Sequence, residues 1–151
     1  MIRDNNPGNI RPTKDNWQGK IGVSDRNFII FDTLANGYRA MLINLYNVVR
    51  NRQVSTIDEL GAIWAPNEEP GQTVNMNWPN NVSKGFGSRT LPIQFTRDVA
   101  GRLAKAISIA ENSAFDQAAI DAALQDSRVM GFYGTKFGWT PAEQAAKKKV
   151  R

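Results

Sequence analysis

The sequence contains no cysteine and no histidine among its 151 residues. Disulfides, thiol nucleophiles and metal-binding thiolates are therefore excluded, and so are catalytic triads built on an imidazole and nearly all zinc sites. We expect neither a metal ion nor an organic cofactor. Any catalysis by this chain must use carboxylates, hydroxyls, lysine amines or amides.

Long hydrophobic runs are also missing. The longest apolar stretch, residues 40–49, is interrupted by Asn44 and Asn47, and the first nine residues, MIRDNNPGN, lack the apolar core of a signal peptide. These features predict a soluble chain without a membrane span or an export signal. If the protein acts outside the cytoplasm, another component must carry it there.

Most of the excess positive charge lies at the C-terminal end. The formal net charge is +5, but four of the 19 basic residues fall within 147–151, so residues 1–146 hold 15 basic against 14 acidic residues. We predict one domain over residues 1–146, long enough for a single core, followed by a basic tail at 147–151. Such a tail is typical of a solvated end, although it favours contact with an anionic cell wall, membrane or DNA. The charge pattern therefore gives only weak support to a nucleic-acid-binding module.

Hydrophobic patterning predicts a mainly helical α+β domain with one short β-hairpin in its N-terminal third. β-branched and aromatic residues on both sides of the turn-prone segment Ser24–Arg26 predict the hairpin within residues 17–31. Apolar residues at helical spacing then predict a core helix over residues 33–49, with Arg39 and Arg50 facing solvent.

Capping signals mark the starts of further helices. Ser55 to Asp58 has the form of a capping box, and the helix that it opens would end before Pro66. Asp116 is a suitable cap for a helix that runs to Leu124, and Thr140 opens a last helix with a proline at its first position.

The segment 64–87 is rich in Pro, Asn and Gly and predicts a long irregular loop around a short helix at residues 80–84. Loops of this length are often functional. Trp64 and Trp78, if exposed, suit stacking on sugar faces, whereas the alternative is that each covers the core. Residues 129–139 show no strong periodicity.

The helix predicted over residues 96–113 carries a glutamate on its apolar side. At about 100° per residue, Glu111 falls between the directions of Ala100 and Ala104. The opposite side is assigned to polar residues, namely Arg97, Asp98, Arg102, Lys105 and Ser108. A glutamate in the last helical turn faces the negative end of the helix dipole, which disfavours its ionised form. Glu111 is therefore either a general acid or an end residue that points into solvent.

The opening segment, RDNNPGNIR at residues 3–11, predicts a dense turn. Asn and Asp side chains bond nearby backbone, Pro7 fixes its own φ, and Gly8 tolerates a positive φ. Side-chain amides in such a turn offer the donors and acceptors that sugar hydroxyls and N-acetyl groups need. The alternative is a loop that only fixes the N-terminus.

The sequence resembles phage virion-associated proteins of the lysozyme superfamily or lytic transglycosylase type. The likeness spans most of residues 3–125 and is most specific in RDNNPGNIR. The other matching pieces are Trp-x-Gly at 17–19, Phe28 and Phe31, Gly37–Ala40, Trp64–Pro66, Asn81–Lys84, Leu91–Ile93 and Ala110–Asn112.

The resemblance implies a lysozyme-like fold in which a helix presents one glutamate to a cleft beside a β-hairpin, with the glycan strands of peptidoglycan as substrate. Glu111 takes the position of the catalytic acid, and the substrate-binding positions are Asn5, Asn6, Asn9, Arg11, Trp64, Glu69 and Trp78. The resemblance also implies a location in the phage virion beside other virion proteins, with action in the host periplasm or cell wall. In better-known members the glutamate helix precedes the hairpin, so we predict a circular permutation.

The sequence departs from the related pattern at two places. Similar sequences have His-Glu-Asn-Gly where this chain has Ala110–Ser113, and a Glu-Asn pair and a later Tyr where it has Glu68–Pro70 and Trp78. A non-catalytic virion protein on the same fold is therefore the alternative to an enzyme. A lytic transglycosylase is favoured over a hydrolase because it needs one carboxylate. The second acid of a hydrolase would come from Glu68, Glu69, Asp25 or Asp32.

Overall fold

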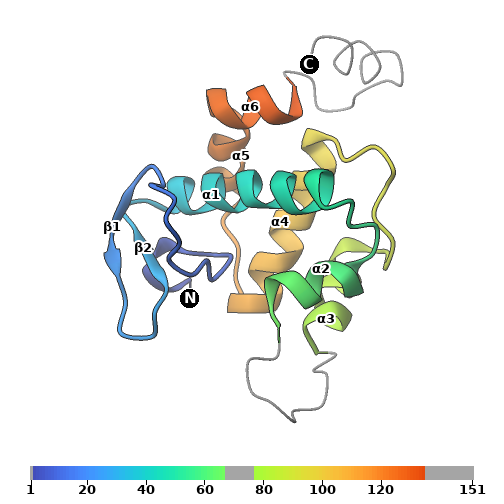
Figure 1. Cartoon of the computed structure of the whole chain (residues 1–151), viewed down its shortest axis with the longest axis horizontal. Helices are drawn as coiled ribbons and strands as arrows, with labels where there is room; N and C mark the ends of the chain where they lie inside the picture. The colour runs from blue at the N-terminus through green and yellow to red at the C-terminus, as the bar shows by residue number, and fades with distance from the viewer. Residues whose placement is uncertain (1, 67–76, 135–151) are drawn as a thin grey trace.

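A computed structural model of the chain describes residues 2–66 and 77–134 (Figure 1). It confirms a mainly helical α+β arrangement with a small two-stranded antiparallel hairpin. The elements in chain order are a 3-10 turn η1 (Arg3–Asn5), β1 (Lys20–Val23), β2 (Ile29–Phe31), α1 (Leu34–Tyr46), a π-helical turn η2 (Asn47–Asn51), α2 (Ile57–Trp64), α3 (Asn77–Phe86), α4 (Arg97–Asn112), α5 (Gln117–Leu124) and α6 (Ser127–Tyr133).

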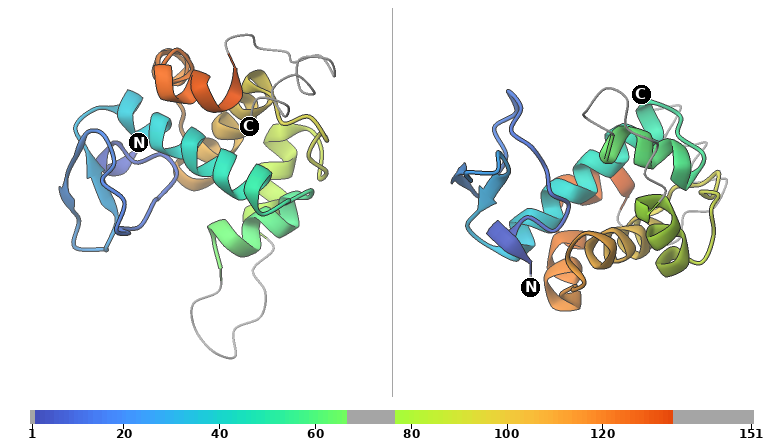
Figure 2. Two further views of the ribbon diagram at one scale, coloured as in Figure 1. Left: turned by 45° about the horizontal axis from the view of Figure 1, so that its top comes forward. Right: turned by 90° about the horizontal axis from the view of Figure 1, so that it is seen from below.

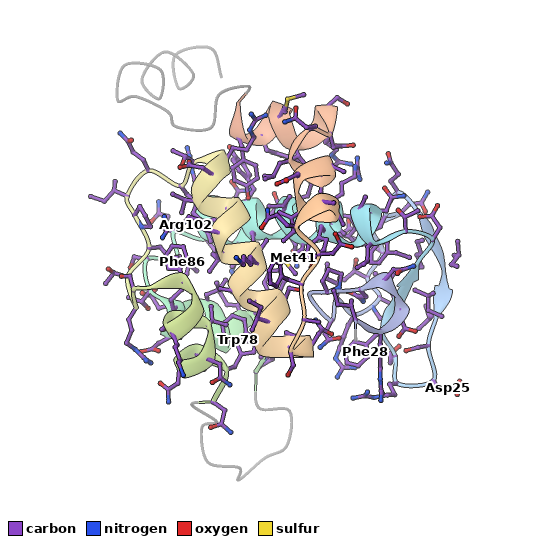
Figure 3. The ribbon with its side chains drawn as sticks, turned by 180° about the vertical axis from the view of Figure 1, so that it is seen from behind. Asp25, Phe28, Met41, Trp78, Phe86 and Arg102 are labelled. Carbon is purple, nitrogen blue, oxygen red and sulfur yellow. The ribbon has the colours of Figure 1, made fainter. Side chains whose placement is uncertain are left out.

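Helix α1 runs through the middle of the molecule, and the other elements pack around it (Figures 1 and 2). The hairpin and η1 lie beside its N-terminal end, whereas α2 and α3 lie beyond its other end. Helix α4 contacts α1, α3 and α5, and α6 covers α1 from the side opposite α3. The main core lies between α1 and α4, where Met41, Leu42, Leu103 and Ile107 are fully buried; Figure 3 shows Met41 near its centre.

The predicted hairpin is confirmed. Strand β1 pairs with β2 in antiparallel register, Val23 opposite Ile29, with an irregularity between Lys20 and Gly22. Asn27 takes a left-handed φ of 65° and completes the turn, which Asn tolerates better than most residues. The inward side chains of β2 form a second, smaller cluster, made of Ile10, Ile29, Phe31 and Ala40.

Most predicted caps are in place, with one shift and one change of partner. Asp116 accepts a hydrogen bond from the Ala119 amide and caps α5 as predicted. The capping box of α2 lies one residue later than predicted: Thr56 accepts from the Glu59 amide, and Glu59 accepts from the Thr56 hydroxyl. Thr96 is the residue before α4, but its hydroxyl donates to the Asp98 carboxylate and caps no backbone amide.

Three side chains predicted to face solvent are buried. Arg39 forms an ion pair with Asp126 at 3.0 Å. Arg97 is 3% exposed and donates to the Leu124 carbonyl at 3.3 Å, and Ser108 is fully buried. The prediction was wrong for Arg39 and Arg97 because α5 and the turn into α6 cover them. It was wrong for Ser108 because Tyr38 of α1 and the turn after α4 cover it, and the periodicity of a single helix reveals neither contact. Arg50 is half-buried over the Tyr46 ring.

Two helices differ from the sequence prediction. Helix α3 spans Asn77–Phe86 and is longer than the predicted 80–84. Helix α6 begins at Ser127 and runs into the segment 129–139 that was judged non-periodic; it is capped by Asp126, which accepts from the amides of Arg128 and Val129. The helix predicted after Thr140 and the tail at 147–151 lie outside the described residues. Within the described ranges, no helix has the length and apolarity needed to cross a bilayer.

Candidate active site

Glu111 lies in the last turn of α4, where the helix meets the opening segment and α3. Its side chain is half-buried. The carboxylate oxygen Oε1 accepts a hydrogen bond from the Trp78 indole Nε1 at 2.5 Å, and Oε2 accepts from the Asn9 amide Nδ2. Figure 3 shows Trp78 on α3, next to α4. The Glu111 carboxylate therefore lies against one side-chain amide of the opening segment, that of Asn9.

The opening segment reaches Glu111 through an unusual backbone. Asp4, Asn5 and Asn9 have left-handed φ values of 60°, 51° and 48°. Gly8, in contrast, has no positive φ, so the predicted reason for this glycine was wrong. The space beside it is small, because a Cβ at Gly8 would lie 3.0 Å from the Trp64 ring. Left-handed residues other than glycine often cluster at functional sites.

Hydrogen bonds from side chains hold this turn in place. The Asn112 amide donates to the Pro7 carbonyl at 2.8 Å, and the Trp64 indole donates to the Gly8 carbonyl at 2.9 Å. Asn6 is 1% exposed, and its amide donates to the carbonyls of Ile10 and Ile29, both at 2.9 Å. The backbone on both sides of Asn9 is therefore fixed to α2, α4 and β2.

The other predicted binding residues have mostly structural partners. Asn5 donates to the Phe31 carbonyl at 3.1 Å, and Arg11 lies over the Phe28 ring. Trp64 is half-buried and Trp78 is 9% exposed, so of the two alternatives Trp78 follows the one in which the ring covers the core, and Trp64 is partly covered. Glu69 lies outside the described residues. The structure therefore brings Asn9, Trp64 and Trp78 close to Glu111. Asn5, Asn6 and Arg11 instead join the opening segment to the hairpin.

Burial raises the pKa of the Glu111 carboxyl above its usual value, and the hydrogen bonds from Asn9 and Trp78 offset part of this rise. Burial favours the neutral acid, whereas donated hydrogen bonds favour the carboxylate. The net direction is upward. A carboxyl with a raised pKa retains its proton closer to neutral pH than an exposed glutamate does, which suits a general acid.

A second polar cluster supports the end of α4 and was missed by sequence reasoning. The Tyr38 hydroxyl is 2.8 Å from the Ser108 hydroxyl and accepts from the Asp116 amide, and Ser108 donates to the Ala114 carbonyl. These bonds fix the turn that follows Glu111. Periodicity assigned Tyr38 to packing alone, and no sequence signal connects it to Ser108, 70 residues away.

The candidates for a second acid do not meet Glu111 in the described residues. Asp25 is exposed in the hairpin turn, and Figure 3 places it far from Trp78. Asp32 is exposed and accepts from the Asn36 amide at 2.8 Å. Glu68 and Glu69 lie outside the described ranges. Over the residues that the structure describes, no group of three or more acidic side chains is arranged to hold a metal ion.

The chain matches no model of a known protein family and no curated protein. Its functional interpretation therefore depends on the geometry around Glu111 and on the motifs of the opening segment.

Proposed function

We propose that this chain is a peptidoglycan-cleaving enzyme of the lytic transglycosylase type, with Glu111 as its single catalytic acid and base. The observation that carries the proposal is the Glu111 carboxyl itself, which is half-buried, has a raised pKa and lies against the asparagine turn of the opening segment. A buried carboxyl among neutral hydrogen-bonding groups is the arrangement that holds a proton for transfer to a glycosidic oxygen.

The reaction needs one carboxyl group in two protonation states. Protonated Glu111 donates to the glycosidic oxygen as the bond breaks, and the carboxylate then takes the proton from the C6 hydroxyl of the muramic sugar, which closes an anhydro ring. A hydrolase instead needs a second acid at about 5–9.5 Å to act on water or on the sugar. Neither Asp25 nor Asp32 contributes to the pKa of Glu111, and Glu68 and Glu69 lie outside the described residues. We favour the transglycosylase reaction because it needs only the one carboxyl group that the described site contains.

The proposed fold is a circularly permuted lysozyme-like domain, and the proposed setting is a phage virion that acts on the host cell wall. The order of elements supports this, because the hairpin and the asparagine turn precede the helix that carries Glu111. Asn9, Trp64 and Trp78 are the substrate-binding candidates nearest to the acid, and Asn5, Asn6, Arg11 and Glu69 complete the proposed set. Glycan strands, and other virion proteins, are the proposed partners.

The test is the Glu111→Gln variant, with purified peptidoglycan as substrate. General acid and base catalysis is worth about 10²–10⁴-fold, so we expect muropeptide release to fall by at least that factor. Glu59→Gln is the matched control, because Gln can replace Glu in a capping box, and its turnover should stay unchanged. Mass spectrometry of the products distinguishes anhydro ends from reducing ends. Full turnover by Glu111→Gln excludes the assignment.

A non-catalytic virion protein is the second candidate. The observation that favours it is that both oxygens of Glu111 already accept hydrogen bonds from within the protein, so the carboxylate also serves to tie α4 to α3 and to the opening segment. This function requires that the unmodified protein release no muropeptides and that it be present in stoichiometric amounts in virus particles.

A further inference from the structure

The two hydrogen-bond partners of Glu111 differ in what they can do. The indole Nε1 of Trp78 can only donate, whereas the carboxamide of Asn9 donates through Nδ2 and accepts through Oδ1. Trp78 faces Oε1 and Asn9 faces Oε2. The two carboxyl oxygens therefore lie in chemically distinct surroundings.

The geometry points to Oε2 as the oxygen that carries the proton of Glu111, with the Asn9 carboxamide as its partner in both protonation states. Asn9 donates through Nδ2 to the carboxylate and, after a half-turn of its amide, accepts through Oδ1 from the acid. This assignment deepens the proposed function by naming the reacting oxygen, and it rests on that function only where it concerns catalysis.

Protonation of Oε1 would weaken its hydrogen bond from Trp78. In a protonated carboxyl the carbonyl oxygen is the better acceptor, and the hydroxyl oxygen is a weak one. A proton on Oε1 would leave the buried Trp78 N–H facing the weak acceptor, and a buried donor without a good acceptor is destabilising. A proton on Oε2 keeps Oε1 as the carbonyl oxygen, so the bond from Trp78, at 2.5 Å, persists in both states.

Of the two partners of Glu111, Asn9 can rearrange and Trp78 cannot. Trp78 is 9% exposed, and its ring packs so closely on α2 that a Cβ at Gly61 would lie 3.0 Å from it. The Asn9 amide forms no other side-chain hydrogen bond within the described residues, and its half-turn exchanges Oδ1 and Nδ2 without moving the backbone. The backbone itself is held through the carbonyls of Pro7 and Gly8.

No neighbouring charge competes with this arrangement in the part of the chain that the structure describes. Burial and the two hydrogen bonds account for the pKa of Glu111, and no charged side chain of the opening segment, α3 or α4 contributes to it. The protonation state of Glu111 is therefore set by neutral partners.

In the proposed reaction, the proton moves from Oε2 to the glycosidic oxygen, which keeps the electron pair of the breaking bond. The muramic C6 oxygen forms the new bond to the anomeric carbon, and its proton returns to Oε2. Asn9 Nδ2 supports the carboxylate between these two transfers.

The experiment is a pH titration of the full chain by ¹⁵N–¹H NMR, without substrate. As Glu111 takes up its proton, we expect the Asn9 side-chain amide resonances to move strongly, because the donated bond becomes an accepted one. The Trp78 indole resonance should stay downfield and move by less than half as much. Glu111→Gln is the control in which both titrations disappear. An indole resonance that moves more than the amide resonances overturns the assignment.

Two variants give an independent measure through the Glu111 pKa, read from its ¹³C carboxyl resonance. Trp78→Phe removes a donor that bonds more strongly to the carboxylate than to the neutral acid, so it should raise the pKa. Asn9→Gly keeps the left-handed backbone accessible but removes a partner of both states, so its shift should be less than half that of Trp78→Phe. Equal or larger shifts in Asn9→Gly contradict the proposal. Because neither readout needs turnover, an inactive protein can still show this proton placement, and an active one can fail to show it.

Discussion

The two groups that contact Glu111 are held in place by different forces. Trp78 is positioned by apolar packing, as part of the main core between α2, α3 and α4. Asn9 is positioned by hydrogen bonds, because the backbone on both sides of it is bonded to Asn6, Trp64 and Asn112. The packed side depends on many apolar contacts of the ring, whereas the hydrogen-bonded side depends on a few specific donors.

This difference indicates how the positions of the side chains around Glu111 are fixed. Packing places a large ring within a few tenths of an ångström by excluding alternatives, but it cannot orient a flexible turn of small polar residues. Side-chain donors aimed at successive carbonyls can do so, since each bond fixes one peptide unit. The following predictions separate the two contributions.

The largest expected effect comes from Gly37 in α1, where the opening segment presses on the helix. A Cβ at this position would lie 1.8 Å from the Asn5 carbonyl oxygen and 2.8 Å from Pro7. We expect Gly37→Ala to displace the segment and to lower the free energy of unfolding by about 3 kcal/mol or more, measured by urea denaturation.

Gly131→Ala in α6 is the control for that variant. Among the residues that the structure describes, a Cβ there meets no atom within 4 Å, so the better helix propensity of alanine should stabilise the protein by up to about 1 kcal/mol. If Gly37→Ala unfolds at the same urea concentration as the unmodified chain, the close contact between the opening segment and α1 is disproved.

A smaller effect is expected from Trp64→Phe, which keeps an aromatic ring but removes the donor to the Gly8 carbonyl. The loss of one partly buried hydrogen bond should cost about 1 kcal/mol. Trp17→Phe is matched to it, because the buried Trp17 Nε1 has no hydrogen-bond partner within the described residues. Thermal unfolding should therefore show a larger loss of stability for Trp64→Phe than for Trp17→Phe. A larger loss for Trp17→Phe would show that the Trp64 donor does not stabilise the turn.

The smallest expected effect is a change in the pH dependence of stability. The pKa of Glu111 is raised above its ordinary value of 4.5, so its contribution to stability is fully present below pH 4.5 and is lost as the pH rises through the folded-state pKa. Glu111→Gln does not ionise and escapes this loss. Relative to the unmodified chain, the variant should gain stability between acidic and neutral pH in urea titrations. A constant difference between the two proteins would show that the Glu111 pKa is unshifted.

Much of the helical body could be predicted from the sequence, because each amphipathic helix shows its own buried side. Helices α1 and α4 begin one residue after the predicted starts at 33 and 96, and α5 follows its predicted cap, Asp116. The burial of Arg39 and Ser108 could not be predicted, since it arises from elements that pack on the second side of α1 and α4. This packing depends on the tertiary fold and produces no hydrophobic periodicity in the sequence.

The site was predictable in part. The position of Glu111 on the apolar side of its helix indicated burial. The resemblance indicated that Glu111 lies near the opening segment. The specific pairing of Glu111 with Asn9 and Trp78 could not be read from spacing, because both contacts join distant elements. Asn112 gave a weak signal as the neighbour of Glu111, yet its bond to the Pro7 carbonyl depends on a turn whose left-handed residues no simple pattern specifies.

The contacts of Glu111 span 102 residues to Asn9 and 33 residues to Trp78. Closing the longer loop costs conformational entropy, which other tertiary contacts must offset. Before that closure the side chain at position 111 is an ordinary solvated glutamate with an ordinary affinity for protons. A partly folded or interrupted chain is thus expected to lack the raised pKa of Glu111, because the burial that raises it depends on the tertiary structure.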